Sequence, residues 1–270
     1  MSLSNNQQPI IEIKKLGTAF NGEWIHKDLD LTIMPDRFVT IIGASGCGKT
    51  TLVREIMMLQ PITSGEIYLM GEKISNYSLE DPDTKRVLSK MGMMFQLGAL
   101  YNSYSILDNV IYPIMEYSDF SYELARELAY QKLRMTGLKE IAYGKYPREI
   151  SPGMQKRAAL ARTLALDPKV LFLDEPTAGL DPNSAAAFDE LMLTLQEQLK
   201  LTIIMITHDL DSIWRTSDEI VYLSNKKVAL HDTVLNAANH EDIPDLYNYF
   251  NGERGKVAKA YYSKLKKDNN

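Results

Sequence analysis

Residues 43–50, GASGCGKT, form a glycine-rich run that ends in lysine and threonine. The run follows an apolar stretch at 38–42, which predicts a buried strand, and leads into a predicted helix at 49–59. This context is typical of a phosphate-binding P-loop, in which backbone N–H groups and a helix N-terminus attract phosphate oxygens. We therefore expect Lys49 to bridge the β- and γ-phosphates of a nucleotide, and the Thr50 hydroxyl to bind Mg²⁺.

A second run, VLFLDE at 170–175, ends an apolar strand in two carboxylates. Side chains alternate along a strand, so the two acids should point to different sides and serve different purposes. We expect Asp174 to hold Mg²⁺, mostly through water, and Glu175 to polarise the attacking water as a general base. A strand end with two solvated acids is the alternative, and the P-loop favours the first interpretation.

The composition indicates a globular chain with a sizeable core: 270 residues, 45% hydrophobic, with one cysteine and a formal net charge of −5. A lone Cys47 excludes a disulfide scaffold and is interpreted as a small loop residue. The acidity argues against nucleic-acid binding. The apolar runs are too short to span a bilayer, and residues 1–9 do not form a secretory signal, so a soluble, cytosolic chain is expected.

Strand-like and helix-like segments alternate along most of the chain. This predicts an α/β fold, a parallel sheet with flanking helices, interrupted by a helical insertion at about 97–157. The predicted strands lie at 10–13, 29–33, 38–42, 67–70, 91–95, 170–173, 202–206, 219–223 and 227–230. The clearest predicted helices lie at 49–59, 122–135, 154–165 and 183–199.

Over residues 10–252, these motifs and their order resemble those of the nucleotide-binding subunit of ABC transporters. The resemblance implies a P-loop (RecA-like) ATPase core with a β-rich subdomain and an inserted α-helical subdomain, and ATP and Mg²⁺ as cofactors. It implies that Gln96 is the Q-loop glutamine and a Mg²⁺ ligand, that 178–181 is the D-loop, and that His208 is the catalytic switch histidine beside Lys49 and Glu175. The implied ATP-binding residues are Phe20, Gly43, Ser45, Gly46, Cys47, Gly48, Lys49, Thr50, Thr51, Gln96 and His208, with Ser151, Gly153 and Asp181 from the second subunit.

The signature segment of that family is occupied by ISPGM at 150–154, with Pro152 in place of a glycine and Met154 in place of a glutamine. Proline suits the first turn of a helix that Ser151 would cap, where the missing N–H has no partner anyway. Ser151 and Gly153 are retained, so an active site is expected. No role is assigned to His26, His231 or His240.

Two runs, MMFQLGALY at 93–101 and PGMQKRAALAR at 152–162, resemble the ATPases of Mce-type lipid transport systems, those of Mla phospholipid transport in particular. The resemblance implies a homodimer at the cytoplasmic face of the inner membrane. This homodimer would bind an integral-membrane permease of the Mce-associated type and a small STAS-domain subunit. It would drive phospholipid movement between inner and outer membranes. An ATPase for a lipoprotein or a small solute is the alternative.

The carboxyl-terminal tail, 253–270, is predicted as a basic appendage. Six basic residues and no acidic one lie between 254 and 267, so the rest of the chain carries about −11. Three interpretations remain open for this tail: an amphipathic helix on anionic lipid, an arm on the neighbouring subunit, or a solvated end.

Overall fold

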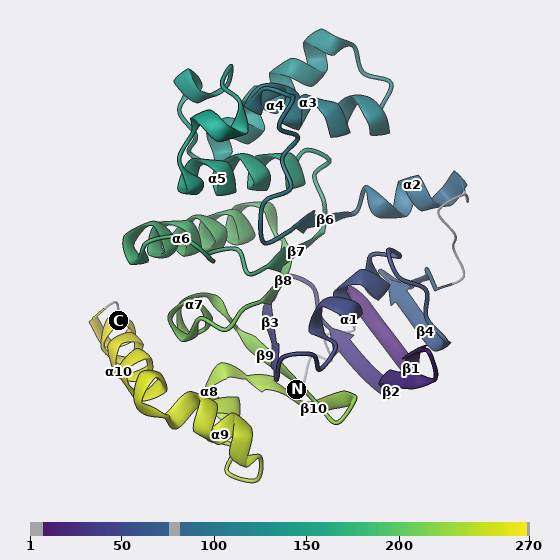
Figure 1. The fold of residues 1–270 in the computed structure, drawn as a ribbon, viewed down its shortest axis with the longest axis vertical. Coiled ribbons are helices and arrows are strands. Elements are labelled where there is room, and N and C mark those ends of the chain that lie inside the picture. Colours follow the sequence, from purple (N-terminus) through teal and green to yellow (C-terminus); the bar gives the residue numbers. More distant parts are fainter. Residues whose placement is uncertain (1–7, 76–81, 269–270) are drawn as a thin grey trace, which may run out of the picture. The chain divides into compact units, whose positions relative to one another are not determined.

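The computed structural model describes residues 8–75 and 82–268. The chain folds into two compact units (Figure 1). The first unit joins 1–79 to 206–270, and the second consists of 80–205. The P-loop and His208 therefore belong to the first unit, whereas Asp174, Glu175, Gln96 and the signature segment belong to the second.

An antiparallel sheet forms the amino-terminal part of the first unit, in the order β2–β1–β4–β5. Its strands are β1 (Ile11–Phe20), β2 (Glu23–Ile33), β4 (Ser64–Leu69) and β5 (Glu72–Lys73). Both β1 and β2 are longer than predicted, because left-handed residues interrupt the alternation of apolar side chains: Lys15 has φ 47° and Asp28 has φ 50°. The register of β1 against β2 shifts next to Lys15, as it does at a bulge.

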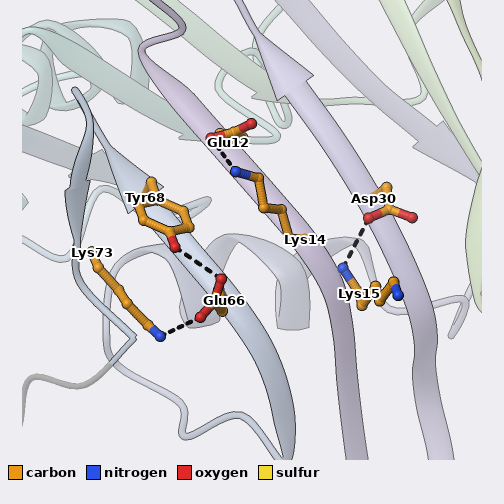
Figure 2. Close-up of polar contacts among 7 residues, drawn as sticks. All are labelled: Glu12, Lys14, Lys15, Asp30, Glu66, Tyr68 and Lys73. Atoms are coloured by element: carbon orange, nitrogen blue, oxygen red, sulfur yellow. Dashed lines mark hydrogen bonds and ion pairs between the residues drawn. The ribbon is translucent and has the colours of Figure 1, made fainter.

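A ladder of polar contacts, made partly within strands and partly between them, lies on this sheet (Figure 2). The ladder consists of Glu12, Lys14, Lys15, Asp30, Glu66, Tyr68 and Lys73. Glu66 accepts hydrogen bonds from Lys73 and, at 2.8 Å, from the hydroxyl of Tyr68. The hydrogen bond from Lys73 is the main reason that the pKa of Glu66 is lowered. These groups are solvated, so the ladder contributes little stability.

The rest of the first unit places β9 (Glu219–Ser224) between β3 (Phe38–Gly43), to which it is parallel, and β10 (Lys227–Thr233), to which it is antiparallel. The helices are α1 (Lys49–Ile56), α7 (Leu210–Thr216), α8 (Val234–Ala238), α9 (Pro244–Asn251) and α10 (Glu253–Asp268). One apolar cluster joins β9 to α7, α8, α9 and α10 through fully buried side chains such as Ile213, Leu246 and Phe250.

The tail forms helix α10, which packs on α7 of the same chain (Figure 1). Ala258 and Tyr262 are buried in the apolar cluster, and Arg215 of α7 donates a hydrogen bond to the Tyr262 hydroxyl at 2.7 Å. Packing on its own subunit is not among the three interpretations left open above. One face of the tail is packed as far as Tyr262, so it is not a frayed end up to that residue, and its other face, with Arg254, Lys256 and Val257, is exposed.

The second unit contains β6 (Met91–Met94), β7 (Val170–Asp174) and β8 (Thr202–Ile206), with β7 in the middle and parallel to β6. Residues 170–173 and all of β8 are buried, as expected of apolar parallel strands. The helices are α2 (Pro82–Leu88), α3 (Ile106–Tyr117), α4 (Tyr122–Met135), α5 (Pro152–Thr163) and α6 (Pro182–Leu199). Helices α3, α4 and α5 share an apolar core. Among the helices that the structure describes, each is too short or too polar to cross a membrane.

Candidate nucleotide site

The P-loop has the predicted strand–loop–helix context, between β3 and α1. Gly48 is the N-cap of α1, and no side chain of the described residues caps this helix, whereas Ser105, Ser121 and Ser151 cap α3, α4 and α5. The first N–H groups of α1 are therefore left for an anion, as phosphate binding requires. The Lys49 side chain is 92% buried in the loop, and its Nζ donates to the carbonyls of Gly43 (2.8 Å) and Ala44 (3.0 Å). These residues fit a bound polyphosphate.

A cleft of about 360 Å³ opens beside the start of the P-loop. It is lined by Ile42, Gly43, Ala44, Ser45, His208, Tyr222, Asp245 and Tyr249. The structure thus brings His208 to the P-loop. The Tyr249 hydroxyl donates to the His208 carbonyl at 3.2 Å, so helix α9 contributes to this cleft, which the sequence did not predict. Phe20, at the end of β1 and 39% exposed, is not among the described residues that line it.

A buried His–Glu pair lies directly behind the P-loop. His26 and Glu55 are fully buried and 98% buried, and His26 Nδ1 lies 3.1 Å from Glu55 Oε2. A side chain at Gly48, whose φ is 102°, would place its Cβ 2.4 Å from His26 Nε2, so only glycine fits there. Among the described residues, His26 Nε2 and Glu55 Oε1 have no hydrogen-bond partner. Burial of the pair costs desolvation free energy, and two of its four side-chain polar atoms do not regain a hydrogen bond among the described residues.

We expect Glu55→Leu alone to lower the free energy of unfolding by about 1–3 kcal/mol, because it leaves the buried His26 Nδ1 without a hydrogen-bond partner. Replacing both residues, His26→Leu with Glu55→Leu, should restore or exceed the original stability, since an apolar pair needs no hydrogen bonds. Urea unfolding of the two single variants and the double variant measures the coupling. A double variant that loses the sum of the two single losses would contradict this prediction.

In the second unit, Asp174 ends β7 and Glu175 follows it with both residues half-buried. Glu175 adopts φ 46°, the left-handed region that costs a non-glycine residue about 1–2 kcal/mol. Its carbonyl accepts from the N–H of Ala178 at 3.2 Å, which folds the chain back into the D-loop segment. Strained backbone of this kind is concentrated at functional sites.

The signature segment begins α5 as predicted. Ser151 is the N-cap and accepts from the N–H of Met154 at 3.3 Å, and Pro152 occupies the first turn. A Cβ at Gly153 would meet open space, so the backbone is accessible there. Gln96, two residues after β6, is exposed.

Asp181 of the D-loop segment caps α6 through the N–H groups of Asn183 (3.1 Å) and Ser184 (3.0 Å). A hydrogen bond from the Ser184 hydroxyl is the main reason that the pKa of Asp181 is lowered. The carboxylate is therefore ionised at neutral pH and exposed.

Residues 26–178 match the family described as ABC transporter. The chain belongs to this family. Over 87% of the chain and 88% of the relative, it is 35% identical to the intermembrane phospholipid transport system ATP-binding protein MlaF of Haemophilus influenzae. It is 40% identical to the methionine import ATP-binding protein MetN 2 of Staphylococcus epidermidis, over 74% of the chain and 58% of that protein.

A solved ABC structure supports the fold. A dimeric ATP-binding cassette in a post-hydrolysis state, bound to ADP and Pi, superposes with a TM-score of 0.75 at 28% identity. The match covers 83% of this chain and 98% of that one. The chain is thus an ABC transporter ATPase with the ABC cassette fold that the sequence predicted.

Proposed function

We propose that this ATPase drives phospholipid transport between inner and outer membranes. The similarity to MlaF carries the proposal, because it extends over 87% of this chain at 35% identity, whereas the similarity to MetN 2 extends over 74% of it. The runs at 93–101 and 152–162 point to the same class of transporter. Import of a small solute or transport of a lipoprotein is the second candidate, and the similarity to methionine, iron and polyamine import proteins favours the small solute.

We assign the nucleotide chemistry to the P-loop, the strand ends and His208. The P-loop residues 43–51 would wrap the phosphates, and Lys49 would bridge the β- and γ-phosphates. Phe20 would stack on the adenine ring, and His208 would contact the γ-phosphate. Glu175 would accept a proton from the attacking water.

Mg²⁺ fits the oxygen donors of Thr50, Gln96 and Asp174, which are hard ligands, and supplies charge neutralisation on the phosphates when bound. In a homodimer, Ser151, Gly153 and Asp181 of the second subunit would complete the site. Closing of the dimer on ATP and its reopening after hydrolysis would give a two-state element that a membrane partner can read.

The membrane partner is proposed to dock beside Gln96. Leu97 is 91% exposed, and the rings of Tyr101, Tyr104 and Tyr112 pack together, with Tyr101 and Tyr112 centroids 5.3 Å apart. Exposed apolar side chains that gather next to a functional loop favour a protein contact. The partner would be a permease of the Mce-associated type, with a small STAS-domain subunit, which would hold the ATPase peripherally at the cytoplasmic face of the inner membrane.

Affinity purification from detergent-solubilised membranes tests this proposal. We expect the chain to retain a Mce-associated permease together with bound phospholipid, identified by mass spectrometry. Leu97→Asp should lose the permease, because it buries a charge in an apolar contact. Ile141→Asp is the control, since Ile141 is 77% exposed in the same unit. A solute permease with a substrate-binding protein in place of the lipid system would refute the phospholipid assignment.

A further inference from the structure

Helix α5 carries cations that bind backbone carbonyls of neighbouring loops. Arg162 donates to the carbonyls of Ala99 (2.7 Å) and Gly98 (3.2 Å). Arg157 donates to the carbonyl of Thr136 at 2.7 Å. The Arg162 contacts tie the helix that begins with the signature segment to the loop that follows Gln96, and the Arg157 contact ties it to the end of α4.

Lys156 differs from these arginines in what it connects. Its Nζ donates to the carbonyl of Gln96 at 2.6 Å and to that of Glu175 at 3.3 Å. One ammonium group therefore joins helix α5, which begins with the signature segment, to the loop at Gln96 and to the residue that follows β7. All three segments lie in the second unit.

The position is an expensive one for a cation. Lys156 is 93% buried, and burial lowers its pKa, although Glu175 and Asp174 act in the opposite direction. Removing an ammonium from water costs several kcal/mol, which an apolar side chain of similar length would avoid. The contacts of Lys156 must therefore contribute more than packing.

The contact with Glu175 falls on strained backbone. Glu175 has φ 46°, and its carbonyl is held by the N–H of Ala178 and by Lys156 together. A left-handed non-glycine residue persists only where its surroundings fix it. Lys156 is one of the donors that do so, and the direction of the Glu175 side chain depends on that backbone conformation.

We propose that Lys156 is a positioning residue that fixes Glu175 and Gln96 relative to the signature helix. The inference rests on the proposed function, because it takes Glu175 as the general base. Lys156 does not touch the nucleotide in this role and acts through the backbone of the two residues that would contact water and metal. Its loss should lower the hydrolysis rate and leave ATP affinity, which depends on the P-loop of the other unit, nearly unchanged.

Single-turnover hydrolysis by the full-length chain tests the proposal. Lys156→Met keeps the length of the side chain and removes the donors, so the rate should fall at least about tenfold. The dissociation constant of ATP should stay within about twofold of the original. Lys156→Arg keeps a cationic group with N–H donors and should recover most of the rate. If the Met variant does not fold, Lys156→Gln, with an N–H donor at shorter reach, replaces it and should hydrolyse ATP more slowly than the original chain.

Lys132→Met is the matched control. Lys132 is a buried lysine of the same unit, on α4, and its Nζ pairs with Asp167. This variant should lose thermal stability and keep its hydrolysis rate. If Lys156 had a purely structural role, Lys156→Met would behave in the same way.

Three results would overturn the proposal: a normal hydrolysis rate in Lys156→Met, an equal loss of hydrolysis rate in Lys132→Met, or a Lys156→Arg variant as slow as Lys156→Met. Normal turnover in Glu175→Gln would instead remove the base assignment, and this proposal with it. Loss in Glu175→Gln together with normal turnover in Lys156→Met would overturn the present proposal alone.

Discussion

Glu175→Gln is expected to lower the rate of ATP hydrolysis by about 10²–10⁴-fold, the usual contribution of a general base. The amide keeps the shape of the side chain but cannot accept the proton of the attacking water. The contacts that the carbonyl of residue 175 accepts from Ala178 and Lys156 remain in this variant. ATP binding should persist, because the P-loop is unchanged.

Two measurements check this prediction. Phosphate release under single-turnover conditions gives the rate, and light scattering after size-exclusion chromatography with ATP gives the mass. The variant should accumulate as a long-lived dimer with ATP bound. Glu197→Gln, on the exposed face of α6, serves as the control and should hydrolyse normally. Turnover at the original rate in Glu175→Gln would remove Glu175 as the base.

Lys49→Ala is expected to weaken ATP binding by at least about 100-fold, because charge-assisted contacts to phosphate contribute about 1.5–3 kcal/mol each. In the structure, Lys49 holds the carbonyls of Gly43 and Ala44. A phosphate that enters the loop offers the same ammonium group a charged acceptor in place of two neutral ones.

The comparison of ATP with adenosine makes this test specific. Calorimetric titration should show a loss of affinity for ATP and no loss for adenosine, which carries no phosphate. Lys227→Ala removes an exposed lysine of the same unit and should change neither affinity. Tight ATP binding by Lys49→Ala would refute the assignment of the P-loop.

Much of the fold could be predicted because its strands are continuous apolar runs. Residues 170–173 and 202–206 are apolar in sequence and buried in the structure. The first strand was predicted four residues long and is ten, since Lys15 adopts a left-handed conformation that breaks the alternation. Helix α1 ends at Ile56 and not at 59, because Met58, with φ 57°, turns the chain out of the helix.

The residues of the candidate site also fall into those that the sequence could predict and those that it could not. Motifs that are contiguous in sequence, such as 43–50 and 170–175, could be recognised from residue types alone. His26 and Glu55 could not be paired in advance, because one lies on β2 and the other on α1, and neither position shows its partner in the local pattern. Lys156 was missed for the same reason, since its acceptors are carbonyls, which every residue has. Tyr249 reaches His208 only through the packing of α9.

The cations of α5 bind carbonyl groups of other segments, and this choice of acceptor affects how the protein responds to ionic strength. Carbonyl groups have no net charge, and the Lys156 contacts are buried, so dissolved ions screen them weakly. The solvated pairs in Figure 2, such as that of Lys73 and Glu66, are in contact with dissolved ions, whose screening length falls from about 10 Å in 0.1 M salt to about 3 Å in 1 M salt. Concentrated salt therefore erodes the charged surface of the antiparallel sheet and leaves the loop at Gln96 anchored.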